Sequence, residues 1–145
     1  IYNRTFFEAE MKRLERGRQF PISIMVVNVS GLTNLNQPGD QESRDKLFIR
    51  IARQLFYAYR GDDIVARVGE NDFAALLPNV DENIAAQITN RVQGDLLQTK
   101  RNENEPALQF FIGTSTAKEG ESLSPALNKA VAIAHLKRKN ANLSP

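Results

Sequence analysis

Apolar residues recur along the chain with two different spacings, and each spacing predicts one kind of element. In some stretches they lie three and four positions apart, which is the period of an amphipathic helix. These stretches cover residues 3–17, about 41–59, about 81–98 and about 124–139. Between them lie short apolar runs rich in β-branched residues, which are typical of buried strands. These runs are Ile22 to Val29, Ile64–Val68, Phe73–Leu77 and Leu108–Ser115.

The connections between these elements indicate how the sheet is assembled. Only residues 69–72 separate the second strand from the third, which predicts a β-hairpin with a polar tip. Hairpin strands are antiparallel, whereas the other strands are joined through helical crossovers, so the sheet should be mixed. No repeat or low-complexity linker interrupts the order of elements. Residues 1–145 are therefore expected to form one α/β domain.

Two of the helices carry more detailed signals. Ser124 and Pro125 have the residue types of a helix cap and a first helical position, which predicts the start of the last helix. On the third helix, the apolar positions expected to face the core are Ile84, Ala85, Ile88 and Val92.

Composition and charge narrow the range of functions. The 145 residues, 41% of them apolar and 25% charged, have the profile of a soluble globular domain. Cysteine is absent, which excludes disulfides and thiolate metal sites and fits a cytoplasmic location. The net charge of +2 is small and dispersed apart from residues 137–139, so nucleic-acid binding is not expected. The longest aliphatic run, Ile24 to Val27, is too short to cross a bilayer, so no membrane contact is expected.

The hairpin tip carries the most specific motif in the chain. Residues 67–78 read R-V-G-E-N-D-F-A-A-L-L-P, which resembles the stretch R-y-G-G-D-E-F-a-i-l-l-P of GGDEF domains, the diguanylate cyclases of bacterial signalling. The resemblance continues in register along nearly the whole chain. Further matched segments are Tyr2-Asn3-Arg4, Ile24–Ser30, Asn36, Asp45, Ile51–Leu55, Asp63–Arg67 and Ile112-Gly113.

The resemblance implies a fold and a setting for the domain. The fold is α/β (α+β), with a central mixed sheet of about five strands flanked by helices, similar to the palm-like fold of GGDEF proteins and adenylyl cyclases. The match begins just inside the family's opening motif, L-T-G-L-x-N-R, at Tyr2. We therefore expect this domain to be excised from a larger multidomain signalling protein.

The resemblance also implies a catalytic site that has lost its metal-binding carboxylates. Diguanylate cyclases join two GTP molecules with the help of divalent cations, which prefer anionic oxygen ligands. The family supplies these ligands at two positions that here hold Asn28 and Asn71, so no metal ligand is predicted. Asp72 retains the acidic fourth position of the motif as a vestigial catalytic residue, and Glu70 replaces its second glycine. No cofactor is expected, and Mg²⁺ would be needed only if residual cyclase activity existed.

Parts of the nucleotide site match the family pattern. Asn36 and Asp45 stand at the guanine-recognising positions, and Arg138 stands where the last helix carries a phosphate-binding lysine. The alternative for Asn36 and Asp45 is that they are ordinary loop and helix-cap residues. Thr33 replaces another lysine of the family. His135, at a position where the family usually has tyrosine, is expected to be a packing residue.

A second ligand site is implied by the segment Arg60-Gly61-Asp62-Asp63. This R-x-x-D motif is separated from Gly69 by five residues, which is the spacing of the family's inhibitory site for cyclic di-GMP. Arginine presents a planar fork to a phosphate or a guanine edge, and aspartate accepts hydrogen bonds from guanine. Arg91 stands where the family places a second arginine of this site. The alternative is a surface ion pair at a helix end.

Three functions follow from these residues. The leading hypothesis is a degenerate, catalytically inactive GGDEF domain that binds cyclic di-GMP through Arg60, Asp63 and Arg91. The second is a weak diguanylate cyclase that still binds GTP and recruits a metal through Asp72 and Glu70. The third is a non-catalytic interaction domain that forms a homodimer or contacts other signalling domains.

Overall fold

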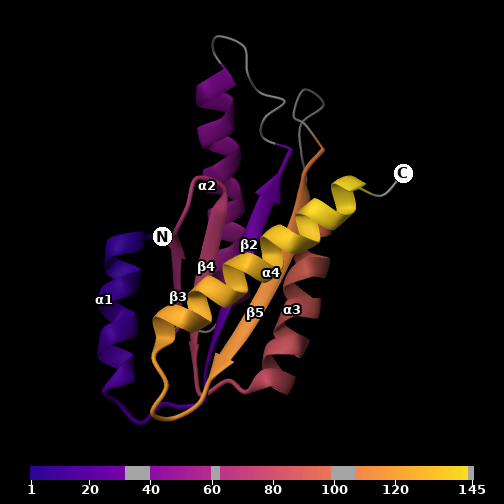
Figure 1. Cartoon of the computed structure of the whole chain (residues 1–145). Coiled ribbons are helices and arrows are strands. Elements are labelled where there is room, and N and C mark those ends of the chain that lie inside the picture. The colour runs from indigo at the N-terminus through magenta and orange to yellow at the C-terminus, as the bar shows by residue number, and fades with distance from the viewer. Residues whose placement is uncertain (32–39, 60–62, 99–106, 144–145) are drawn as a thin grey trace.

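The computed structural model describes residues 1–31, 40–59, 63–98 and 107–143, which form one sheet covered by helices on both faces (Figure 1). The predicted order of helices and strands is confirmed, with one short strand added at the start. The elements are β1 Tyr2–Asn3, α1 Arg4–Glu15, β2 Ile22–Ser30, α2 Asp40–Ala58, β3 Ile64–Arg67, β4 Asp72–Pro78, α3 Glu82–Leu97, β5 Gln109–Ala117 and α4 Leu123–Leu143. None of the described helices is both long enough and apolar enough to cross a membrane.

The sheet is mixed, as the connections predicted. Its strand order is β1-β3-β4-β2-β5, and only the β1–β3 pair is parallel. The hairpin of β3 and β4 is antiparallel, with Ala66 opposite Ala74. Strand β2 lies between β4 and β5, and its residue Asn28 is paired with Asp72 on one side and with Phe111 on the other.

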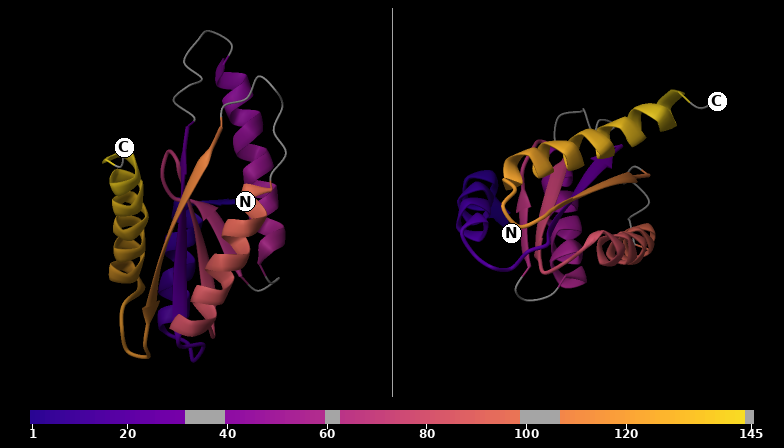
Figure 2. Two further views of the ribbon diagram at one scale, coloured as in Figure 1. Left: turned by 90° about the vertical axis from the view of Figure 1, so that its right-hand side faces the viewer. Right: turned by 60° about the horizontal axis from the view of Figure 1, so that its bottom comes forward.

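Alternation along β2 divides the apolar residues between two cores. Met25 and Val27 belong to the cluster formed with α2 and α3, whereas Ile24 and Val26 belong to the cluster formed with α1 and α4. Successive side chains of a strand point to opposite faces, so a strand covered on both faces is apolar throughout. Figure 2 shows α4 on one side of the sheet and the pair α2 and α3 on the other.

Some details differ from the sequence prediction. Strand β1 was not predicted because its two residues are too few to form a pattern. Ile84 is 42% exposed, so it does not face the core as expected. Helix α4 begins at Leu123, one residue before the predicted cap at Ser124. Its first N–H group donates to Glu15 Oε1 at 2.6 Å, so a carboxylate from α1 supports the helix start in place of the serine.

Helix α4 lies very close to the sheet at Gly113. A Cβ atom built at this position would lie 2.2 Å from the carbonyl oxygen of Ala130 and 2.7 Å from the amide nitrogen of Ala134. Both atoms belong to the backbone of α4, so they cannot move aside as a side chain could. Lys137 adds a hydrogen bond from its Nζ to the carbonyl oxygen of Ile112 at 2.7 Å. Glycine is therefore required where β5 meets α4, and this contact sets the height of the helix above the sheet.

Gly113→Ala is expected to destabilise the domain by about 2–3 kcal/mol, because the added methyl group forces α4 away from β5. Gly94→Ala is the matched control, since a Cβ atom there meets nothing within 4 Å. Gly94 lies inside helix α3, so this substitution should stabilise by up to about 1 kcal/mol. Urea unfolding followed by circular dichroism measures both changes. Equal stability of the two variants would contradict the close contact.

Candidate functional site

Arginine side chains hold the main chain of the β3–β4 hairpin. Arg4 Nη1 donates to the carbonyl oxygen of Val68 at 2.8 Å. Arg67 donates from Nε to the carbonyl of Gly69 at 3.3 Å and from Nη2 to that of Glu70 at 2.5 Å. Three consecutive carbonyl groups of the turn are therefore bound by guanidinium groups, which are strong and permanently charged donors. The path of the hairpin backbone is fixed by these contacts.

The hairpin tip accommodates Glu70 without a glycine-like backbone. Asn79 is the only non-glycine residue with a positive φ among the described residues, so Glu70 does not use the left-handed region. Its side chain is exposed. The backbone of Asn71 accepts a hydrogen bond from the N–H group of Val29 at 2.9 Å, which ties the tip to the end of β2.

Asn28 and Asp72 form the buried polar centre of the site. The register of β2 and β4 places them directly opposite each other, and the strand alternation directs both toward α4. Asn28 Nδ2 donates to Asp72 Oδ1 at 2.7 Å. Asn28 is 1% exposed and Asp72 is 8% exposed. A buried carboxylate needs hydrogen-bond donors, and the amide of Asn28 provides one.

Helix α4 completes this centre with two more side chains. His135 Nε2 lies 2.8 Å from Asp72 Oδ2, and Arg138 Nη1 lies 3.5 Å from Asn28 Oδ1. His135 was expected to be a packing residue, and this prediction was wrong. The helical spacing of three positions could have shown that His135 and Arg138 share a face. No local pattern indicates that this face lies over Asp72.

The donor set at the hairpin does not fit a divalent cation. Mg²⁺ favours carboxylate ligands, and Asp72 is the one buried carboxylate of the described residues. Both of its oxygens are hydrogen-bonded, and Asn28 Oδ1 faces a guanidinium group. Within the described ranges, no three His, Asp or Glu side chains are grouped to hold a metal ion. The centre is a closed hydrogen-bonded network rather than an open set of metal ligands.

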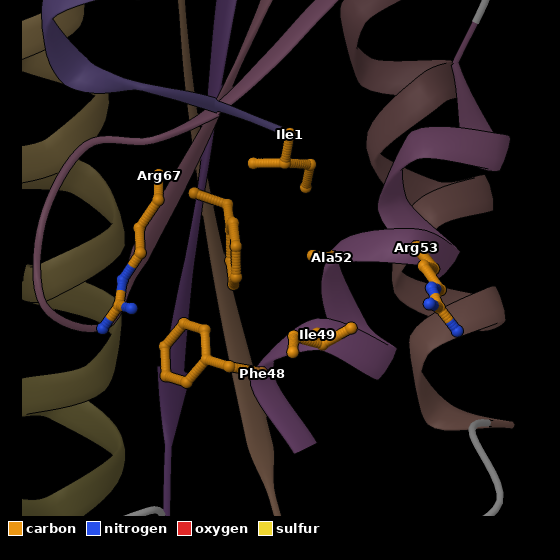
Figure 3. Close-up of a pocket in the computed structure, with 7 residues that line it drawn as sticks. Ile1, Phe48, Ile49, Ala52, Arg53 and Arg67 are labelled. Carbon is orange, nitrogen blue, oxygen red and sulfur yellow. The ribbon is translucent and has the colours of Figure 1, made fainter. Parts of the chain in front are cut away.

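A cavity of about 490 Å³ lies on the other face of the sheet, between α2 and the edge formed by β1 and β3 (Figure 3). Its walls are apolar and aromatic, with the rings of Phe48 and Phe73 at 5.1 Å between centroids. The guanidinium carbon of Arg67 lies 4.2 Å from the centroid of the Phe48 ring. Such a cavity can accept a flat ring system by stacking. The residues that line it are Ile1, Phe48, Ile49, Ala52, Arg53, Arg67 and Phe73.

The predicted guanine-recognising residues are placed only in part. Asp45 is exposed on α2, one helical turn before Phe48 and Ile49 of the cavity wall. Asn36 and Thr33 lie outside the described residues. Arg138 is on α4, which covers the opposite face of the sheet from α2, and it contacts Asn28 there. Asp45 and Arg138 therefore belong to different parts of the site.

The residues of the predicted cyclic di-GMP site lie only partly within the described ranges, around the end of α2. Arg91 on α3 donates from Nη2 to the carbonyl oxygen of Ala58. Burial raises the pKa of the Tyr59 hydroxyl; the negative charge of Asp63 raises this pKa further, and the positive charge of Arg91 lowers it. The Tyr59 hydroxyl donates a hydrogen bond to Met25 Sδ at 3.1 Å, which ties the end of α2 to the core. Arg60 lies outside the described residues.

The chain is similar in sequence to a known family and to several known proteins. A family model described as diguanylate cyclase, GGDEF domain, matches residues 1–142. Similar proteins include YtrP of Bacillus subtilis, which is 25% identical over 145 residues, covering 98% of this chain and 24% of YtrP. The probable diguanylate cyclase DgcC of Escherichia coli is 24% identical over 128 residues, covering 86% of this chain and 34% of DgcC. The chain thus spans about a quarter to a third of the length of these relatives.

Solved structures share the fold. The GGDEF domain of DgcB from Caulobacter crescentus, crystallised with c-di-GMP, gives a TM-score of 0.82 at 20% identity, covering 96% of this chain and 84% of that chain. The diguanylate cyclase SiaD from Pseudomonas aeruginosa, crystallised with its activator SiaC, gives 0.79 at 23% identity, covering 95% and 55%. The predicted fold class is therefore confirmed.

Asn28→Ala is expected to destabilise the domain by about 1–3 kcal/mol, because it removes a donor from the buried carboxylate of Asp72. Asn71→Ala is the matched control, since among the described residues only the backbone of Asn71, and not its side chain, takes part in a hydrogen bond. Its substitution should change stability by less than about 0.5 kcal/mol. The midpoints of urea unfolding measure both effects, and an unchanged midpoint for Asn28→Ala would show that the network adds no stability.

Proposed function

The chain belongs to the GGDEF domain family, and on this premise we propose that it is a non-catalytic receptor domain for cyclic di-GMP in bacterial second-messenger signalling. One observation carries the proposal. The carboxylate of Asp72 has protein hydrogen-bond partners on both oxygens, whereas Arg91 donates at a separate place, to the carbonyl of Ala58 at the end of α2.

Loss of the cyclase reaction follows from the chemistry that this reaction needs. Attack of a ribose hydroxyl on an α-phosphate requires cations to neutralise the charge that develops on the phosphates. Asn28 and Asn71 each carry one negative charge less than the family's ligands. Asp72 already has Asn28 and His135 as hydrogen-bond partners, and a cation would compete with them for its carboxylate. The loss of two carboxylates in a buried site is expected to cost several kcal/mol of metal affinity.

Retention of a cyclic di-GMP site is supported by the position of Arg91. Its guanidinium group reaches the carbonyl of Ala58, at the end of the helix that leads into the R-x-x-D segment. Asp63, which ends that segment, is only partly buried and can accept hydrogen bonds from a guanine edge. Arg60 supplies a second guanidinium group in the sequence. Crystallisation of DgcB with c-di-GMP is a precedent for this ligand on a protein of the same fold.

The cavity beside Asp45 favours a second candidate function, which is residual nucleotide binding with weak cyclase activity. Its aromatic walls suit a purine base. Asp45 lies one helical turn before Phe48 on α2 and could accept hydrogen bonds from such a base. A third candidate, an interaction domain that acts on a second copy or on other signalling domains, has a precedent in the complex of SiaD with its activator. The two experiments below distinguish the three functions.

Calorimetric titration of cyclic di-GMP is expected to show binding that Arg60→Ala and Arg91→Ala each weaken about ten- to hundredfold. This range corresponds to the loss of a charged hydrogen bond worth roughly 1.5–3 kcal/mol. Arg18→Ala is the matched control, because Arg18 is an exposed arginine in the loop before β2. Absence of binding by the unsubstituted chain would indicate that Arg60 and Asp63 form only a surface ion pair. It would favour the third function, a non-catalytic interaction domain.

Incubation with GTP and either Mg²⁺ or Mn²⁺ is expected to yield no cyclic di-GMP, because the metal-binding carboxylates are replaced. Product analysis by liquid chromatography measures the outcome, with an active GGDEF domain as the positive control. Clear turnover that Asp72→Ala abolishes would contradict the proposal and identify a weak diguanylate cyclase.

A further inference from the structure

Both carboxylate oxygens of Asp72 have hydrogen-bond partners in the protein. We propose that His135 hinders the binding of divalent cations at the hairpin, because its ring is the hydrogen-bond partner of the carboxylate that a cation would need. Metal exclusion would then depend on a residue of α4 in addition to the loss of two acidic residues. It concerns the hairpin alone and does not depend on whether cyclic di-GMP binds.

Each oxygen of Asp72 already has one hydrogen-bond partner in the protein, and a cation would have to compete with that partner. Oδ1 accepts from Asn28 Nδ2 at 2.7 Å, and Oδ2 lies 2.8 Å from His135 Nε2. An ionised carboxylate only accepts, so the ring nitrogen is the donor in this contact. The side chain of Asp72 is 11% exposed, whereas that of His135 is 38% exposed. His135 therefore covers the side of the carboxylate that would otherwise face solvent.

A cationic group lies next to the histidine on α4. Arg138 Nη1 lies 3.5 Å from Asn28 Oδ1, which is the remaining neutral oxygen of the network. A guanidinium group is permanently charged and repels a divalent cation that approaches the same oxygen. The two residues lie three positions apart on α4, so they reach the hairpin from the same face of one helix.

The position of α4 keeps His135 over the hairpin. The close contact at Gly113 and the hydrogen bond from Lys137 to Ile112 both flank the histidine along the helix. A helix held by its own backbone at this height cannot withdraw a single side chain by shifting. The donor of His135 is thus presented to Asp72 by the fold, and a metal would have to displace it.

The test distinguishes the effect of His135 on metal binding from the effect of the two missing carboxylates. A background that carries Asn28→Asp and Asn71→Asp restores both acidic positions, and His135→Phe or His135→Gln is then added. Phenylalanine has no donor, whereas glutamine keeps an N–H donor and is equally uncharged. Mn²⁺ binding is measured by electron paramagnetic resonance of the free ion, and folding by circular dichroism.

We expect the restored background to bind Mn²⁺ roughly ten- to hundredfold more tightly with His135→Phe than with His135 in place, because this range corresponds to the loss of one competing hydrogen bond to a charged carboxylate. His135→Gln should leave binding weak, as with histidine. Equal Mn²⁺ affinity with and without His135→Phe would overturn the proposal, and so would a folded Phe variant that binds no Mn²⁺.

A measurement on the unsubstituted protein keeps the proposal testable if the variants do not fold. His135 is the only histidine of the chain, so its ring signals in a proton NMR spectrum need no assignment. Equimolar Mn²⁺ should leave these signals as sharp as those of the rest of the domain, because no cation reaches Asp72. Selective broadening of the His135 ring would overturn the proposal. Titration of cyclic di-GMP into the same samples reports on the receptor function separately.

Discussion

Helix α4 lies so close to β5 that a methyl group at Gly113 would fall 2.2 Å from the carbonyl oxygen of Ala130. This contact sets where every side chain of the helix meets the sheet. His135 lies one position after Ala134, which also borders Gly113, and its ring comes within hydrogen-bond distance of Asp72. The contact between His135 and Asp72 at the hairpin therefore depends on the absence of a side chain at Gly113 on β5.

The same buried carboxylate can be neutralised in two ways. A cation can be its partner when other acidic ligands surround it, or neutral and cationic protein groups can replace that cation. This chain follows the second way, with the amide of Asn28 and the ring of His135 on the two oxygens of Asp72. The hydrogen-bonding capacity of the buried carboxylate is thus met by protein groups alone.

Most of the fold could be predicted from the sequence because each strand and helix has its own period. The tight connection before β4 was enough to predict its pairing with β3, whereas the pairing of β2 with β4, which places Asn28 opposite Asp72, was not predicted. The role of His135 could not be predicted, because it depends on where α4 crosses the sheet, and no local pattern encodes this crossing. The exposure of Ile84 was missed for a related reason, since helical spacing does not say how wide the covered face is. Arg60 and Asn36 stay predictions, as they lie outside the described residues.

The arginine contacts of the hairpin have a consequence for how such a site changes in evolution. Arg4 and Arg67 bind main-chain carbonyl groups, which every residue possesses, so the turn holds its shape whatever side chains occupy its tip. Mutations at Glu70 and Asn71 can therefore accumulate without unfolding the domain. A loop with this kind of support is robust to drift, and the same property would make it a convenient place to install new side chains by design.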